Sequence, residues 1–205
     1  MVKKGAGLAH TSSLTRATGV ALPIVPGPPG TGTVSFALAD LPIPSRRFLA
    51  DRVAVETDGA DILVLFGQTK CRGDGLTQLL VARTSADRVL DVVNSCREFG
   101  PRVREFLTSS GLNSAPPLAF TADPDPTVKV DFSIAAMVHA GYQASIDLYD
   151  LTAWARHDLG RAGATAREAT VEPVVRIQLS TAALGTLLDQ LAVVAPASAA
   201  SMDTK

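Results

Sequence analysis

The three histidines are the side chains best suited to acid–base or metal chemistry near neutral pH, and they are scattered along the chain. His10 lies in a Gly/Ala/Thr-rich amino-terminal stretch, His139 in a predicted turn and His157 in a predicted loop. A metal site needs three or four convergent ligands, and no local spacing supplies them. His157 has a carboxylate neighbour in Asp158, but adjacent side chains do not face one another. The sequence therefore predicts no catalytic residue set, no metal and no cofactor.

The two cysteines, Cys71 and Cys96, are far apart and follow no metal-ligand spacing. This pattern is typical of a reduced, cytoplasmic protein. A single disulfide between them is the alternative.

Two short motifs resemble known binding elements. The stretch Gly27-Pro-Pro-Gly-Thr-Gly32-Thr33-Val34 resembles the phosphate-binding loop of AAA-type ATPases. However, Thr33 replaces the lysine that reaches the phosphates, and Val34 replaces the hydroxyl that holds Mg²⁺. Arg72-Gly73-Asp74 resembles the integrin-binding tripeptide. We interpret the first stretch as a Pro/Gly linker and the second as a polar turn.

Composition narrows the classes of partner. The net charge is −1, from 19 basic and 20 acidic residues, so no field of one sign would attract nucleic acid or an anionic membrane. Hydrophobic residues make up 46% of the chain, which is enough for a core. No stretch approaches the roughly 18 continuous apolar residues of a membrane span. We therefore expect a cytoplasmic protein with no membrane span and no nucleic-acid partner.

Hydrophobic periodicity predicts a unit that occurs twice. Strands are expected at Val53–Thr57, Ile62–Phe66 and Leu79–Ala82, with an Asp58-Gly59 turn and a helix from about Thr84. The second copy has strands at Phe132–Val138, Ile146–Tyr149 and Val174–Leu179. It ends in a helix capped by Ser180 or Thr181, with an apolar face of Leu184, Leu187, Leu188 and Leu191.

These elements predict an α+β fold of two similar halves. Each half is expected to be a mostly antiparallel sheet of three to four strands with one carboxy-terminal helix packed on it. The predicted organisation is a flexible tail (1–32), a first half (33–110), a Pro-rich junction (111–127), a second half (128–194) and a disordered tail (195–205).

Two stretches of the second copy carry a likeness to known domains: Ile146-Asp-Leu-Tyr149 and Arg176-Ile-Gln-Leu-Ser-Thr-Ala-Ala-Leu-Gly-Thr-Leu-Leu188. Through them the repeated unit is similar to small bacterial domains that combine strands with a carboxy-terminal helix, and it resembles the SecB-like export-chaperone fold. The resemblance implies a sheet backed by a helix and protein binding through surfaces. It transfers no functional residue.

The sequence favours a non-enzymatic binding or scaffold protein, with a chaperone-like role among the options, that self-associates through its sheets or binds another protein. The residues expected at that interface are Ile62, Val64, Phe66, Ile146, Leu148, Tyr149 and Trp154. The alternative is an enzyme with a pocket between the halves near His139, Asp147, Tyr149 and His157.

Overall fold

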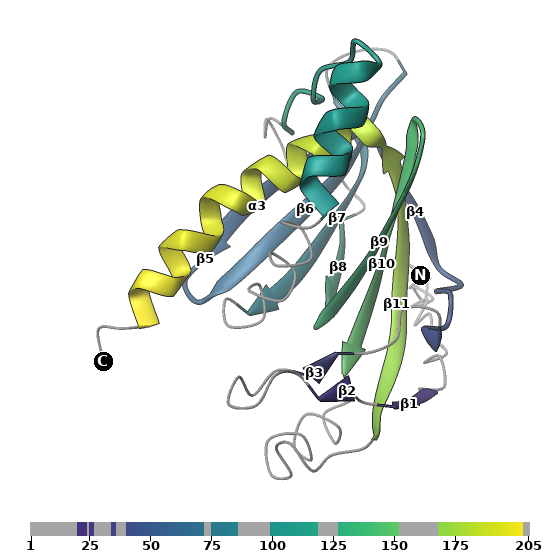
Figure 1. The fold of residues 1–205 in the computed structure, drawn as a ribbon, viewed down its shortest axis with the longest axis vertical. Helices are drawn as coiled ribbons and strands as arrows, with labels where there is room; N and C mark the ends of the chain where they lie inside the picture. Colours follow the sequence, from purple (N-terminus) through teal and green to yellow (C-terminus); the bar gives the residue numbers. More distant parts are fainter. Residues whose placement is uncertain are drawn as a thin grey trace, which may run out of the picture.

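The computed structural model describes residues 20–23, 25–26, 34–35, 40–71, 75–85, 99–118, 127–151 and 168–202, as an α+β fold (Figure 1). A helix covers 99–109. The other elements are β1 (Val20–Pro23), β2 (Val25–Pro26), β3 (Val34–Ser35), β4 (Arg47–Ala50), β5 (Arg52–Asp58), β6 (Asp61–Thr69), β7 (Leu76–Ser85), β8 (Thr127–Asp131), β9 (Ile134–Ala140), β10 (Gln143–Leu151), β11 (Glu168–Ser180) and α3 (Thr181–Met202).

Two main sheets make up the fold. The β11 sheet has the order β1-β11-β10-β9, and β4 pairs in parallel with β11 on the edge that β1 also uses. The β6 sheet has the order β5-β6-β7-β8, in which β8 runs parallel to β7 and the other pairs are antiparallel. Strands β2 and β3 form a separate two-stranded ribbon.

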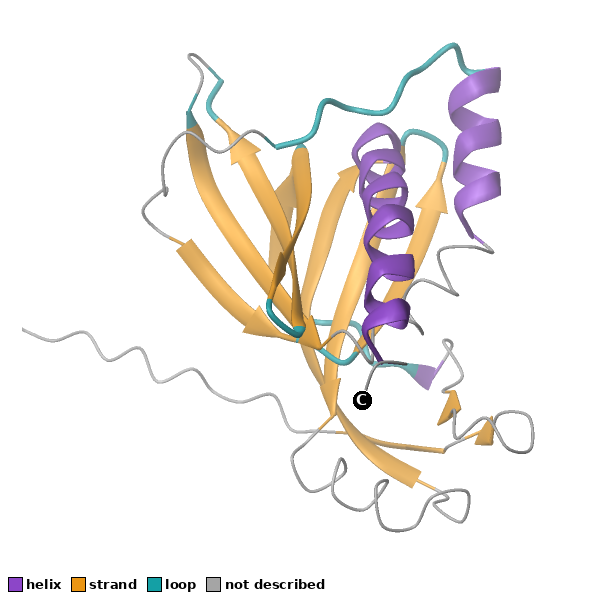
Figure 2. Cartoon of the chain, turned by 90° about the vertical axis from the view of Figure 1, so that its left-hand side faces the viewer, coloured by secondary structure: helices purple, strands orange, loops and turns teal. Residues whose placement is uncertain are grey.

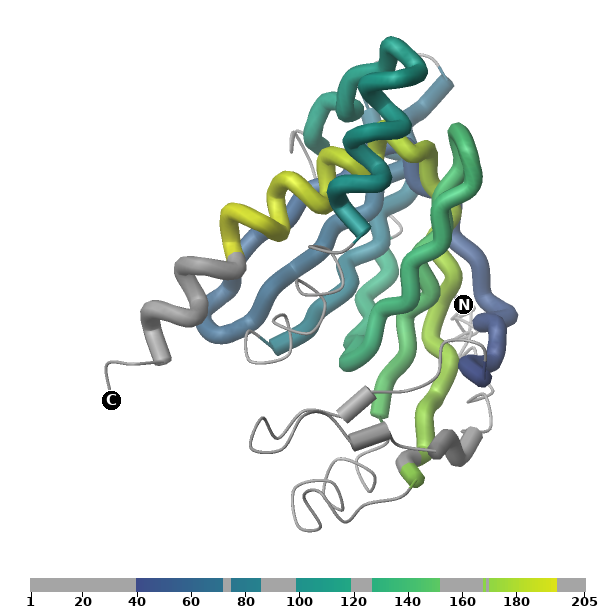
Figure 3. The backbone as a smooth tube through the Cα atoms, viewed as in Figure 1, coloured from purple at the N-terminus to yellow at the C-terminus, as the bar shows by residue number. Residues whose placement is uncertain are grey.

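Two short strands cross between the sheets. β4 continues directly into β5 of the β6 sheet, yet Phe48 pairs with Ile177 of β11. Likewise β8 leads into β9 of the β11 sheet, yet Val130 pairs with Ala82 of β7. Figure 3 follows both crossings along the chain. Each sheet therefore contains a strand whose sequence neighbour belongs to the other sheet.

The main core lies between the inner faces of the two sheets and the helices. Strand alternation turns Val64, Phe66, Ile146 and Ile177 into one buried cluster. The helices add the buried side chains Val103, Leu107, Leu184, Leu187, Leu188 and Leu191. Figure 2 shows both helices on one side of the strands.

Gly185 allows these helices to approach closely. A Cβ atom at this position would lie 2.9 Å from Cδ1 of Leu107 and 3.0 Å from Oγ of Ser114. Ser180 caps α3, since its Oγ accepts a hydrogen bond from the Ala183 N–H at 3.1 Å. The predicted cap is thus confirmed.

The α+β class, the mainly antiparallel sheets and most strand positions are confirmed. The first predicted helix does not begin at Thr84, because β7 continues through Ser85. Residues 112–118, inside the predicted junction, form an extended strap: the Leu118 N–H donates to Val53 O and the Ala115 N–H to Ala182 O. Cys71 is an exposed free thiol. Cys96, the Gly27–Gly32 loop and the Arg72–Asp74 triplet lie outside the described residues.

Candidate functional site

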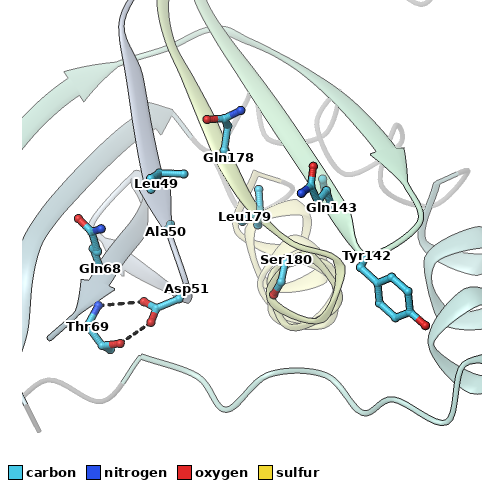
Figure 4. A pocket seen from close by; sticks show the side chains of 11 residues that line it. Leu49, Ala50, Asp51, Gln68, Thr69, Tyr142, Gln143, Gln178, Leu179 and Ser180 are labelled. Carbon is cyan, nitrogen blue, oxygen red and sulfur yellow. Dashed lines mark hydrogen bonds between the residues drawn. The ribbon is translucent and has the colours of Figure 1, made fainter. Parts of the chain in front are cut away.

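A groove with a volume of about 560 Å³ opens where β4, β6 and β11 end, beside the start of β10 (Figure 4). Its lining combines amide, hydroxyl and apolar groups: Leu49, Ala50, Asp51, Gln68, Thr69, Tyr142, Gln143, Ala144, Gln178, Leu179 and Ser180.

The crossing of β4 places these side chains together. Ala50, Ala144 and Leu179 face the core, so their neighbours on the same strands, Leu49 and Gln178, face outward. The end of β6 forms one wall of the groove, and the Gly141–Tyr142 turn forms the other (Figure 4).

The Tyr142 wall is held in place from two directions. The Thr181 N–H donates to Tyr142 O at 3.0 Å, and the Thr181 hydroxyl donates to Gly141 O at 2.6 Å. The Tyr142 ring packs edge-on against Phe106 with 5.4 Å between ring centroids. The start of α3 and the helix 99–109 thus position an aromatic ring that is still 66% exposed.

Asp51 is the one charged residue among the described residues that line the groove. Thr69 donates its backbone N–H to Oδ1 at 2.9 Å and its hydroxyl to Oδ2. The Asp51 N–H in turn donates to Gly67 O at 3.0 Å. These hydrogen bonds fix the end of β6 against the end of β4.

Three glutamine amides remain uncommitted. Within the described part of the chain, no hydrogen bond joins the side chain of Gln68, Gln143 or Gln178 to another protein group, and Figure 4 shows them spread along the groove. Each amide offers both a donor and an acceptor. Leu49, which is 57% exposed, supplies an apolar contact. The groove therefore presents hydrogen-bond donors, hydrogen-bond acceptors and an apolar contact to a ligand.

A second polar cluster is buried on the outer face of the β11 sheet. Arg176 forms a bidentate ion pair with Asp147: Nε lies 2.6 Å from Oδ1 and Nη2 lies 2.6 Å from Oδ2. The Tyr149 hydroxyl points at Oδ2 from 3.4 Å. Burial, followed by the Asp147 charge, raises the pKa of Tyr149 to about 12. These groups satisfy one another, so the cluster is structural.

Most of the predicted interface residues are buried within the chain itself. Ile62, Val64, Phe66, Ile146 and Leu148 belong to the main core. Tyr149 packs with Leu41 and Val171 in a smaller cluster. None of these six side chains is available to a partner while the chain is folded, and Trp154 lies outside the described residues.

Of the residues predicted for an enzyme pocket, the three that the structure describes do not lie together. Asp147 and Tyr149 come together as predicted. His139 instead packs against Phe106 at 5.0 Å between ring centroids, and its Nε2 lies 2.9 Å from Gly141 O. His139 pairs with Ala144, which faces the core, so it points to the opposite face of the sheet from Asp147. His157 lies outside the described residues.

Local sequence patterns missed the residues that line the groove. Leu49, Gln68, Gln143 and Gln178 come from four strands, and only the long-range pairing of β4 with β11 brings them together. A glutamine in a polar or alternating segment carries no local signal of a site. The one available hint was the apolar run Phe48-Leu49-Ala50, in which Leu49 departs from the alternation of apolar and polar residues.

The described residues hold no group of three or more His, Cys, Asp or Glu side chains that could bind a metal ion. Among the same residues, no helix is long and apolar enough to cross a membrane. Searches of protein-family models, of curated proteins and of solved structures found no match for the chain.

Proposed function

We propose that this chain is a non-enzymatic binding protein that holds an uncharged, extended polypeptide segment in the groove. The observation that carries the proposal is the set of three uncommitted amides beside an exposed leucine, in a lining whose carboxylate accepts two hydrogen bonds from Thr69. A peptide bond presents one donor and one acceptor, which matches an amide side chain. A neutral segment with an apolar side chain would use both kinds of contact.

The free edge of β4 supports an extended conformation for this segment. The Arg176 N–H donates to Arg46 O. This hydrogen bond identifies which residues of β4 direct their backbone groups toward β11. Strand alternation then turns the backbone groups of Phe48 and Ala50 toward β11 and those of Leu49 toward the other edge. No strand pairs with that edge among the described residues. An extended peptide that hydrogen-bonds to Leu49 would add a strand there.

We also propose that the fold is a duplicated, SecB-like unit whose two copies exchange their first strands. Support comes from matching detail: β6 and β10 each contain nine residues and have nearly the same burial pattern. The preceding turns each contain a glycine with φ of 60°, Gly59 and Gly141. The pairing of Phe48 with Ile177 has its counterpart in Val130 with Ala82. A chaperone-like role would follow from a groove that accepts many neutral sequences.

A peptide-binding titration tests the proposed function. The probe is a fluorescein-labelled octapeptide of Ser, Asn, Leu and Val with blocked termini, compared with versions that carry two Lys or two Asp residues. We expect fluorescence polarisation to show tightest binding of the neutral peptide. Gln178→Ala and Leu49→Ala should each weaken it by about fivefold, the value of one hydrogen bond or a small apolar contact.

Val193→Ala is the control, because Val193 is an apolar residue on α3 that is 75% exposed and lies outside the groove lining. It should leave the affinity unchanged. Absence of binding, or equal loss in all three variants, would overturn the proposal.

A further inference from the structure

The edge of β9 differs from the other uncovered strand edges. β9 consists of Ile134-Ala-Ala-Met-Val-His-Ala140 and contains no Asp, Glu, Lys, Arg or proline. β8 carries Lys129 and Asp131. β4 begins with Arg47 and follows Pro42 and Pro44. Charges and prolines are the usual protection of a sheet edge against pairing with another chain, and β9 has neither.

The hairpin register identifies the backbone groups on this edge. Ala140 pairs with Gln143 across the two-residue Gly141–Tyr142 turn. Antiparallel alternation therefore turns the N–H and C=O of Ala136, Val138 and Ala140 toward β10. The same groups of Ala135, Met137 and His139 point away from the sheet. Within the described part of the chain, β9 pairs with β10 alone.

The corresponding edge of β5 is covered. The strap donates a hydrogen bond from the Leu118 N–H to Val53 O, and α3 packs against β5. β5 also carries Arg52, Glu56 and Asp58. Among the described residues, no backbone hydrogen bond of this kind reaches the outer edge of β9.

We propose that β9 pairs with β9 of a second copy of this chain, antiparallel and centred on Met137. In this register Met137 lies opposite its twin and Ala135 lies opposite His139, which gives about six hydrogen bonds across the two-fold axis. No charged side chain meets another, and the small Ala135 and Ala136 allow close approach. Val138, which is 55% exposed in the single chain, packs beside Ala136 of the partner.

The strand's own composition favours a second copy over an unrelated strand. An edge without charge offers no electrostatic selection for a foreign partner, whereas its sequence is complementary to itself in the Met137 register. Pairing would join two β11 sheets into one continuous sheet. The inference does not depend on peptide binding in the groove, so the two can fail separately.

Light scattering coupled to size-exclusion chromatography tests the association. We expect a concentration-dependent dimer of the full chain. Met137→Pro removes the central N–H on the unpaired side of an edge strand, where proline is tolerated. It should raise the dissociation constant by at least about tenfold without changing the circular dichroism spectrum. Met137→Ala keeps the N–H and should remain a dimer.

Cysteine cross-linking tests the register, even if the proline variant unfolds. In a Cys71→Ser background, Met137→Cys places two Cα atoms about 5.5 Å apart across the axis, which suits a disulfide. Val138→Cys is more exposed but lies more than about 7 Å from its twin, too far to bridge. We expect a covalent dimer from the first variant and only the background level of the parent from the second.

A monomer at every concentration would overturn the proposal. So would a dimer that survives Met137→Pro in a folded protein, or one that cross-links through position 138 as readily as through position 137.

Discussion

The two main sheets carry different kinds of side-chain pair at the same outward-facing cross-strand position. In the β6 sheet Leu65 lies opposite Val81, and in the β11 sheet Asp147 lies opposite Arg176. The offset that relates Gly59 to Gly141 also relates Leu65 to Asp147. Similar backbones thus carry an apolar pair on one outer face and an ion pair on the other.

The cover of each face accounts for the difference. Leu65 is buried with Leu79 and Ala54 beneath Leu118 of the strap. Asp147 is also buried, but its partner Arg176 keeps 21% of its side chain exposed. An apolar face that is fully covered is stabilised by burial of its side chains. A face that keeps some contact with solvent can hold an ion pair, and this pair fixes the register of β10 against β11. The sheets share a framework and differ in the interactions that close it.

Asp147→Leu should produce the largest effect. It leaves the Arg176 guanidinium half-buried and unpaired, and we expect a loss of about 3 kcal/mol in the free energy of unfolding, measured with urea. The double variant Asp147→Leu/Arg176→Val copies the β6 sheet. It should return to within about 1 kcal/mol of the parent. A double variant as unstable as the single one would show that the two faces are not interchangeable.

The strap should contribute the next largest effect. Leu118→Ala opens a cavity over Leu65 and Leu79, and we expect a loss of about 2 to 3 kcal/mol in the free energy of unfolding. Leu112→Ala is the matched control, because Leu112 lies in the same strap and is 38% exposed. Equal losses in the two variants would argue against a sealed apolar face.

The two hairpin glycines test the equivalence of the sheets directly. Gly59 and Gly141 both have φ of 60°, and a Cβ at either position would meet nothing within 4 Å. Each Gly→Ala change should therefore cost only the backbone strain, about 1 kcal/mol. Thermal unfolding should show matching shifts, and a marked inequality would break the correspondence between the turns.

Tyr149→Phe should have the smallest effect at neutral pH. The raised pKa of about 12 for Tyr149, against 10.0 for the free side chain, means that the folded chain holds this proton more tightly than the unfolded chain. The resulting stability is fully present below pH 10 and is lost as the pH rises through 12. Tyr149→Phe should flatten this decline. Phenolate absorbance in Tyr142→Phe, which leaves Tyr149 as the single tyrosine, should show the high pKa directly.

Local pattern located most of the strands and the start of α3, but it placed a helix at Thr84, where β7 continues, and it could not identify which strands pair. Alternation located the strands around Val64 and Ile146, and it placed Asp147 and Tyr149 on one face. It could not show that Arg176 completes that cluster, because the register across β10 and β11 lies outside any short window. The continuous apolar run at Ile62–Phe66 is equally typical of an interface and of a core, and the structure places it in the core. The groove could not be predicted from the sequence for the same reason, because it forms only when β4 pairs with β11.

The crossing of β4 also has a consequence during synthesis. Phe48 cannot find its partner Ile177 until about 130 more residues have been translated, which takes on the order of ten seconds. By contrast, β8 emerges about 50 residues after its partner β7, and can pair as soon as it is made. We therefore expect nascent chains to complete the β6 sheet first and to leave the segment from Arg47 to Ala50 unpaired until β11 has been made.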